Sequence, residues 1–225
     1  MLKRLFICCF ILLLGACGAT DKSTEPKQVL NYAKSDADFR ALATKIRNQS
    51  ASPEDVDRIL RLYPLTSSYR PESPAEQSAK VKSEQFIQQN SWLRCIQINR
   101  QLLQTNFTSL IGHYGMAICS QEAGDNASAQ YHNWVLDAFI EAIWRSGDGQ
   151  TPETAFYINS THDLYAFIQL HQLMAVEQAL IYRNKLPIQK VIVQNPESQK
   201  NYTWYFDLTP QFRRAHIDKL EGRTN

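Results

Sequence analysis

The sequence predicts an α+β fold in which helical hairpins come first and a small antiparallel sheet with covering helices follows. Through residues 36–145, apolar side chains recur at three- and four-residue spacing, which is typical of amphipathic helices. After residue 146, short segments alternate apolar and polar side chains, which is typical of strands. Helices followed by strands, without regular alternation, indicate the α+β class.

Two helices are expected at the start of this region, over 36–46 and 53–63. The second has a complete start signal, with Ser52 as N-cap, Pro53 in the first helical position and acidic residues in the first turn. Residues 66–74 contain two prolines and four serine or threonine residues, so we expect an irregular connection there.

Four more helices are predicted up to residue 145. Their expected ranges are 75–89, 91–103, 107–121 and 127–145. Two segments align at an offset of 34 residues, which places Asn90 on Gly124 and Cys95 on Ala129. This spacing resembles a degenerate pair of tetratricopeptide hairpins, and a generic antiparallel helical bundle fits the pattern nearly as well.

The C-terminal region is expected to hold the sheet. Strands are predicted over 155–159, 175–182, 188–194 and 201–208, with helices over 163–170 and 210–220. Residues 195–200 are typical of a hairpin loop, and the last helix is expected to pack on the sheet. Tyr202, Trp204 and Phe206 alternate onto one strand face, where a helix-covered core explains them better than a carbohydrate-binding surface.

The N-terminus has the three parts of an export signal. Lys3 and Arg4 precede an apolar run over 5–14, which is too short to span a bilayer, since about 20 apolar residues are needed. The tetrapeptide Leu14-Gly15-Ala16-Cys17 resembles the lipobox of bacterial lipoproteins. The resemblance implies cleavage before Cys17 and attachment of diacylglycerol and palmitate to that residue; plain secretion is the alternative.

These features define four regions: a signal peptide over 1–16, a tether over 17–35, a helical-hairpin region over 36–145 and a small α+β region over 146–225. The last two are expected to pack as one unit. The expected location is the cell envelope, with the domain outside the cytoplasm and held to the membrane by its lipid. Gly18 stands where inner-membrane lipoproteins commonly have aspartate, which favours the outer membrane.

Charge and cysteine usage limit the partners. Removing the signal takes two of the 24 basic residues, which leaves 22 basic and 22 acidic side chains and gives no indication of nucleic-acid binding. Another envelope protein is the expected partner. Cys95 and Cys119 remain after the anchor cysteine, and they either form a disulfide in an oxidising compartment or are two buried thiols.

Candidate sites are few. The tetrad Ser146, Gly147, Asp148 and Gly149 could form an anion-binding nest with Asp148 as a working carboxylate, but a helix end followed by a tight turn explains it better. We expect Gly147 to be the left-handed residue that ends the helix. No two histidines have metal-ligand spacing on one helix, so His113 and His132 could meet only through tertiary contacts, and no metal site is expected.

No nucleophile motif, catalytic set or cofactor-binding motif occurs in the sequence, so no catalytic residue is assigned and no cofactor is expected. This absence favours a protein-interaction or scaffold module over an enzyme. The alternative is an envelope enzyme or small-ligand binder that uses the turn over 146–149.

One longer run resembles a known family. Residues 143–156, Ile-Trp-Arg-Ser-Gly-Asp-Gly-Gln-Thr-Pro-Glu-Thr-Ala-Phe, resemble the signature of the bacterial family called domain of unknown function 4919. Supporting features are Leu62-Tyr63, Tyr69-Arg70-Pro71, Gly124-Asp125, His162-Asp163-Leu164-Tyr165 and Tyr205-Phe206-Asp207. The resemblance implies exported or lipid-anchored proteins without an assigned activity. The chain departs from the family pattern at Leu164, where the pattern implies glutamate.

Overall fold

The computed structural model describes residues 30–222, and from Asn31 onward these form one compact unit. The predicted signal peptide and the lipidation residue Cys17 lie outside the described residues. None of the described helices combines the length and the apolar character needed to cross a membrane.

The second helix begins at Pro53 as the sequence predicts, whereas the first begins at Tyr32, four residues before its predicted start and within the range assigned to the tether. Helix α1 covers Tyr32–Arg47, α2 covers Pro53–Leu62, and a short 3-10 turn, η1, covers Tyr63–Leu65. The Ser52 hydroxyl accepts a hydrogen bond from the Asp55 amide, and the Asp55 carboxylate accepts one from the Ser52 amide, which completes a capping box. Asp55 also forms an ion pair with Lys45 at 2.9 Å, which connects α1 to α2.

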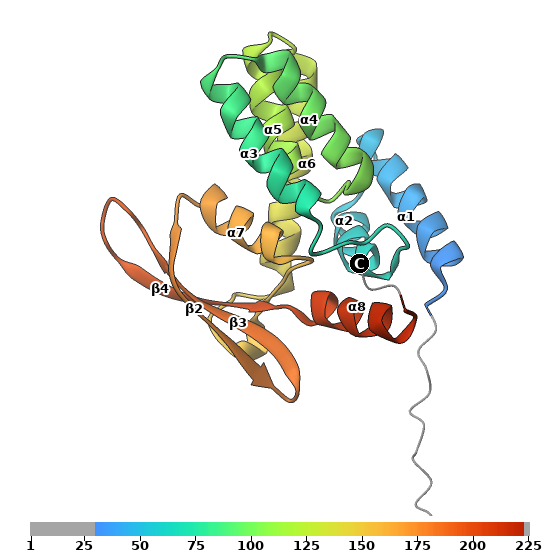
Figure 1. Cartoon of the computed structure of the whole chain (residues 1–225), viewed down its shortest axis with the longest axis vertical. Helices are drawn as coiled ribbons and strands as arrows, with labels where there is room; N and C mark the ends of the chain where they lie inside the picture. Colours follow the sequence, from blue (N-terminus) through green and yellow to red (C-terminus); the bar gives the residue numbers. More distant parts are fainter. Residues whose placement is uncertain (1–29, 223–225) are drawn as a thin grey trace, which may run out of the picture. The chain divides into compact units, whose positions relative to one another are not determined.

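Four helices follow in which each packs against the next (Figure 1). They are α3 (Pro74–Gln88), α4 (Trp92–Thr105), α5 (Leu110–Glu122) and α6 (Asn126–Ser146). A β-carbon at Gly112 or Gly115 of α5 would overlap side chains of α4. Because glycine has no β-carbon, the two helices can approach closely. A disulfide between Cys95 and Cys119 joins the same two helices, with 6.0 Å between the Cα atoms.

The C-terminal region forms a four-stranded sheet in the order β1-β4-β3-β2. Its elements are the 3-10 turn η2 (Pro152–Thr154), β1 (Phe156–Tyr157), α7 (Thr161–Leu170), β2 (Met174–Arg183), β3 (Leu186–Gln194), β4 (Asn201–Asp207) and α8 (Thr209–Leu220). The three long strands form the predicted antiparallel meander, and β1 adds to β4 in parallel. Strand β1 is shorter than predicted because Ser160 already acts as the N-cap of α7.

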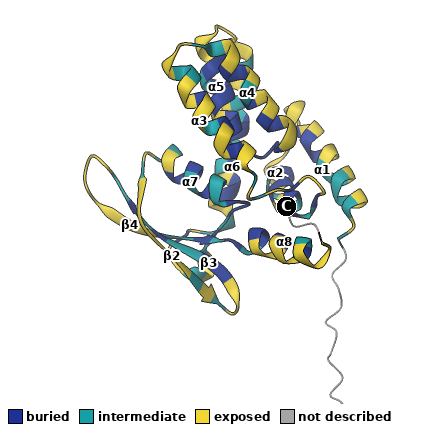
Figure 2. Ribbon diagram, viewed as in Figure 1, coloured by how far each residue is buried: buried dark blue, intermediate teal, exposed yellow. Residues whose placement is uncertain are grey.

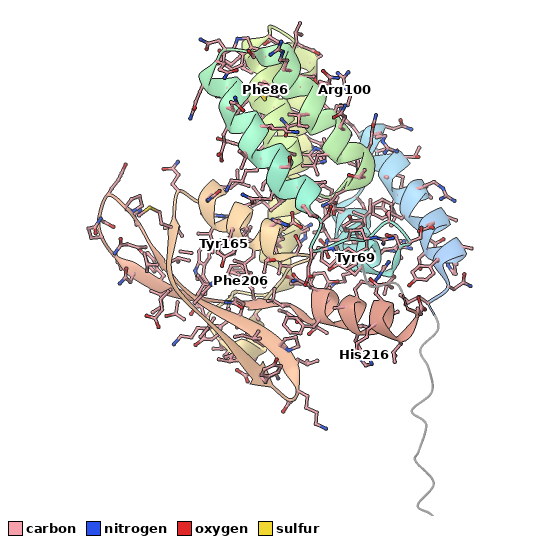
Figure 3. All side chains as sticks on the ribbon, viewed as in Figure 1. Tyr69, Phe86, Arg100, Tyr165, Phe206 and His216 are labelled. Atoms are coloured by element: carbon pink, nitrogen blue, oxygen red, sulfur yellow. A yellow bond between two sulfur atoms is a disulfide. The ribbon has the colours of Figure 1, made fainter. Side chains whose placement is uncertain are left out.

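One face of the sheet is covered by α6 and α7 (Figure 2). Buried aromatic side chains of these helices and of the strands belong to one hydrophobic core. Phe206 is fully buried, and the Trp204 ring contacts those of Trp144 and Phe167. Tyr165 of α7 reaches toward the sheet, and its hydroxyl donates to Gln178 of β2 (Figure 3). Tyr202 departs from the prediction for this strand face, since it is 41% exposed at the far end of β4.

The closing helix lies elsewhere than predicted. Helix α8 does not cover the apolar face of the sheet; it continues beyond the strands and contacts the end of β3 and η1 (Figure 1). The reason is the buried side chain of Arg214, which binds the chain directly after η1 through the carbonyl oxygen of Thr66.

Candidate functional site

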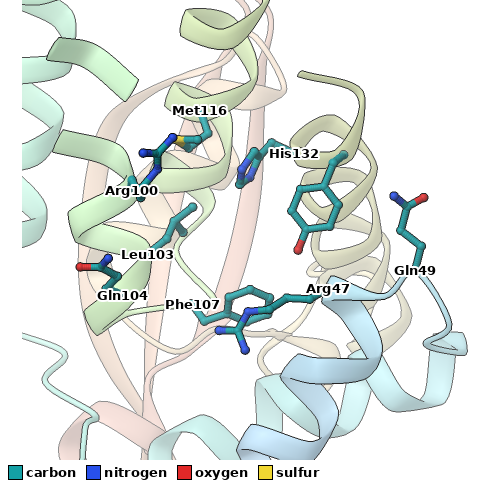
Figure 4. A pocket seen from close by; sticks show the side chains of 9 residues that line it. Arg47, Gln49, Arg100, Leu103, Gln104, Phe107, Met116 and His132 are labelled. Atoms are coloured by element: carbon teal, nitrogen blue, oxygen red, sulfur yellow. The ribbon is translucent and has the colours of Figure 1, made fainter. Parts of the chain in front are cut away.

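A cavity of about 540 Å³ opens among α1, α4, α5 and α6. Figure 4 shows Arg47, Arg100 and His132 around the same space, contributed by three different helices. The full lining comprises Arg47, Gln49, Arg100, Leu103, Gln104, Phe107, Met116, Tyr131 and His132. This volume falls in the range of sites for small organic ligands.

Local structure explains how these side chains converge. Arg47 is the last residue of α1, where a cation interacts favourably with the carbonyl end of the helix dipole. Arg100, Leu103 and Gln104 stand three and four residues apart on α4, so they share one helix face. Tyr131 and His132 come from α6, which follows α5 along the bundle.

The cavity is cationic at its edge and apolar at its floor. No acidic side chain lines it, and within residues 30–222 neither Arg47 nor Arg100 forms an ion pair. The Arg47 guanidinium stacks over the Phe107 ring, 4.7 Å from the ring centroid. Leu103, Phe107 and Met116 are buried beneath. Two unneutralised guanidinium groups over an apolar floor favour an anion with an apolar body.

A histidine pair lies beside the floor. Nδ1 of His113 is 2.9 Å from Nδ1 of His132, and Nε2 of His113 is 2.8 Å from the carbonyl oxygen of Phe107. Burial, then the neighbouring His132, lowers the pKa of His113 to about 3, against the hydrogen bond to Phe107. Burial and the Arg100 charge lower the pKa of His132 to about 4. Both rings are therefore neutral at pH 7.

The two histidines thus meet through tertiary contacts, across α5 and α6. Over residues 30–222 no group of three or more histidine, cysteine or acidic side chains is arranged to hold a metal ion. Tyr131, which precedes His132 in α6, is also partly buried, and its hydroxyl has no hydrogen-bond partner among residues 30–222. Burial raises the pKa of Tyr131, so its hydroxyl keeps its proton at pH 7.

The tetrad over 146–149 lies outside this cavity and forms a turn between α6 and β1. The Gly149 amide donates to the carbonyl oxygen of Thr154 at 2.8 Å, and the Gly147 amide donates to that of Trp144. The Asp148 carboxylate accepts hydrogen bonds from the Thr154 hydroxyl and the Gln150 amide, and these bonds lower the pKa of Asp148. The amides of both glycines, which a nest would direct at an anion, are therefore engaged within the chain.

The prediction for the first glycine of this turn is wrong. Gly147 has an extended backbone with φ of 174°, and the left-handed residue is Gly149, with φ of 65°. Ser146 connects the two elements because its hydroxyl donates to the Ile143 carbonyl and accepts from the Tyr157 amide at 2.8 Å.

Sequence reasoning missed a buried pair of carboxyl groups, Glu76 and Asp163. Glu76 accepts hydrogen bonds from the Ser109 hydroxyl and the Asn106 amide group, and Asp163 accepts one from the Leu110 amide. Burial, followed by the nearby Glu76, raises the pKa of Asp163 well above its ordinary value. Both residues stand in the first turns of their helices, α3 and α7, so the sequence indicates only N-terminal helix acids.

Two other cavities have balanced charges. One of about 590 Å³ among α3, α5 and α7 is lined by Lys80 and Glu84 together with apolar side chains. Another of about 430 Å³ includes Arg70 and Glu76. The cavity that contains Arg47 and Arg100 differs from both in its uncompensated positive charge.

Comparison with known proteins gives one match. A family model described as "Domain of unknown function (DUF4919)" matches residues 53–216. No curated protein matches the chain, and no solved structure matches it. The matched range includes Arg100 and His132, whereas Arg47 and Gln49 precede it.

Proposed function

We propose that this chain, which belongs to the matched family, is a lipid-anchored envelope protein that binds a small organic anion with an apolar body. The description of the family assigns no activity. The single observation that carries the binding proposal is the cavity with two guanidinium groups that no carboxylate among residues 30–222 neutralises. A guanidinium group presents paired donors that match the oxygens of a carboxylate or a phosphate.

Binding, rather than turnover, is the activity that this lining supports. None of its nine residues is serine, cysteine, lysine or an acid, which leaves Tyr131 and His132 as the only side chains of a type that acts as a nucleophile or base. The pKa of His132, lowered to about 4, makes this imidazole a weak base. We therefore propose the ligand-binding site at this cavity instead of at the turn over 146–149.

The binding proposal is tested with the full-length protein in lipid nanodiscs. The probe is 2-naphthoate, and the matched neutral probe is 2-naphthamide. Calorimetry should show that the wild-type protein binds 2-naphthoate. The double variant Arg47→Gln with Arg100→Gln should bind this anion at least about tenfold more weakly, because each charge-assisted hydrogen bond contributes about 1.5–3 kcal/mol.

Matched controls exist on the same helices. Arg40 of α1 and Arg94 of α4 are exposed and lie outside the lining, so Arg40→Gln with Arg94→Gln should leave the affinity unchanged. Equal affinity for the two probes, or full affinity in the Arg47 and Arg100 variant, would overturn the binding proposal.

The anchoring proposal rests on the sequence Leu14-Gly15-Ala16-Cys17. In a Gram-negative host, Cys17→Ser should abolish incorporation of labelled palmitate and release the protein from the membrane fraction. The matched control is Cys9→Ser, which lies in the segment expected to be removed and should retain the label. Labelled palmitate in the Cys17→Ser protein would rule out acylation at this position.

We also propose that α3–α4 and α5–α6 are two degenerate tetratricopeptide-like units. Support comes from the 34-residue offset, because Asn90 and Gly124 both have positive φ in the turns after α3 and α5. Cys95 and Ala129, at the same offset, are both fully buried. An experimental structure in which the two hairpins fail to superimpose at this offset would contradict the proposal.

A further inference from the structure

The hydrogen bonds of the histidine pair determine where each proton lies. The carbonyl oxygen of Phe107 can only accept a hydrogen bond, so Nε2 of His113 must carry a proton. A neutral imidazole has one ring proton, which leaves Nδ1 of His113 as an acceptor. The contact of 2.9 Å between the two Nδ1 atoms then requires the proton on Nδ1 of His132.

The same reasoning continues to the cavity. With its single proton on Nδ1, His132 has an unprotonated Nε2, and the ring lines the cavity (Figure 4). Over residues 30–222 no side chain or backbone group forms a hydrogen bond with this nitrogen. Because the pKa of His132 is lowered to about 4, the acceptor persists at pH 7.

This acceptor is complementary to the two cations of the lining. Arg47 and Arg100 can only donate hydrogen bonds, and both are cationic. A ligand that bound them with its anionic group alone would leave Nε2 of His132 without a donor. A cationic amine on the ligand would be repelled by the two guanidinium groups, which leaves a hydroxyl or a neutral N–H as the suitable donor.

We propose that Nε2 of His132 is a fixed hydrogen-bond acceptor that selects hydroxyl-bearing organic anions, with Phe107 and His113 holding its tautomer. The inference rests on the proposed function for the ligand class, whereas the tautomer itself does not depend on any ligand. His113 is a positioning residue in this arrangement, and His132 is the residue that contacts the ligand.

The tautomer is measured first, by ¹⁵N NMR of the ¹⁵N-histidine-labelled full-length protein in detergent micelles at pH 7. His132 should be protonated at Nδ1 only, and His113 at Nε2 only. His171 provides an internal reference for the Nδ1–H form, because its Nε2 accepts from Trp144 at 3.0 Å and its Nδ1 faces the Phe167 carbonyl at 2.7 Å. A His132 that is protonated at Nε2, or is cationic, overturns the proposal.

Selectivity is measured next, with 6-hydroxy-2-naphthoate and 6-methoxy-2-naphthoate in nanodiscs. The hydroxyl probe should bind the wild-type protein about tenfold more tightly, because only it can donate to the histidine. This ratio should fall to about one in His132→Phe and recover partly in His132→Gln, whose side-chain oxygen accepts.

The outcomes separate the two proposals. A ratio of one in the wild-type protein, with binding that still requires Arg47 and Arg100, overturns the hydroxyl selectivity and leaves the proposed function intact. If the His132→Phe variant keeps the wild-type preference for the hydroxyl probe over the methoxy probe, His132 is not the acceptor that selects the hydroxyl group. If neither naphthoate binds, the proposed function and the ligand class both fail, while the NMR result independently decides the tautomer.

Discussion

Arg214 of α8 donates a hydrogen bond from Nη1 to the carbonyl oxygen of Thr66 at 2.7 Å, although the two residues are 148 positions apart in the sequence. The side chain is 1% exposed and forms an ion pair with Asp218 at 2.8 Å. Its guanidinium also lies over the rings of Tyr32 and Tyr69. The last helix is therefore attached to the first part of the chain through one buried cation.

Arg214→Met should lower the free energy of unfolding by about 3 kcal/mol, because the Thr66 carbonyl and the Asp218 carboxylate lose a buried partner. Denaturant unfolding followed by circular dichroism measures the change. Arg213→Met is the control, since Arg213 is exposed on the same helix and its loss should change stability by less than about 0.5 kcal/mol. Equal effects of the two substitutions would show that burial of Arg214 contributes nothing.

Gly149→Ala should destabilise the protein by more than about 2 kcal/mol. The residue has a φ of 65°, and a β-carbon there would overlap the ring of Phe156. Gly124→Ala is a matched control, because Gly124 also has positive φ but no atom of the described residues lies within 4 Å of its β-carbon position. Only the backbone cost of about 1 kcal/mol therefore applies. Thermal or denaturant unfolding of both variants distinguishes overlap from backbone strain.

Stability should depend on pH through Asp163. Its folded pKa is raised by burial and by Glu76, so the folded state keeps a proton that the unfolded state releases above its own pKa. The contribution of Asp163 is therefore greatest below the unfolded pKa and decreases as pH rises toward the folded pKa, by up to about 1.4 kcal/mol per pH unit.

Asp163→Asn removes this titration, so the variant should gain stability relative to the wild type as pH rises from 4 to 8. Unfolding midpoints at several pH values measure the difference. Asp137→Asn, at an exposed position of α6, should give a difference that is constant with pH. A constant difference for Asp163→Asn as well would contradict the raised pKa.

Reduction of the Cys95–Cys119 disulfide should lower stability by about 3 kcal/mol, because the bond closes a loop with a sequence separation of 24 residues in the unfolded chain. Unfolding is compared with and without dithiothreitol. The double variant Cys95→Ala with Cys119→Ala should be unaffected by the reductant. An effect of similar size in that variant would assign the change to something other than this bond.

Local signals in the sequence were sufficient for most elements. The cap at Ser52 and the proline that follows it predict the start of α2 because capping involves residues only three positions apart. Alternation predicts the three long strands because neighbouring side chains point to opposite faces. The two-residue β1 and its parallel pairing with β4 could not be predicted, since so short a strand has no period of its own.

The candidate site was largely beyond such reasoning. Arg47 and His132 line one cavity although 85 positions separate them, and no spacing rule relates residues on different helices. The sequence singled out His113 and His132 as a possible cross-helix pair, but it contained no sign of the Phe107 carbonyl that fixes their protons. The two glycines of the turn over 146–149 suggested an anion-binding nest in the sequence, and in the structure their amides donate hydrogen bonds within the chain.

By itself, the sequence determined the helices and long strands, the α+β class and the family, because caps, periodicity and a signature run are encoded within short stretches of chain. Tertiary structure alone decided that α7 rather than α8 covers the sheet and that two carboxyl groups are buried together. It also decided that two arginines face an apolar floor without a counter-charge from residues 30–222. The physical reason is that burial and electrostatic environment depend on neighbours brought together by packing, and these neighbours are distant in sequence.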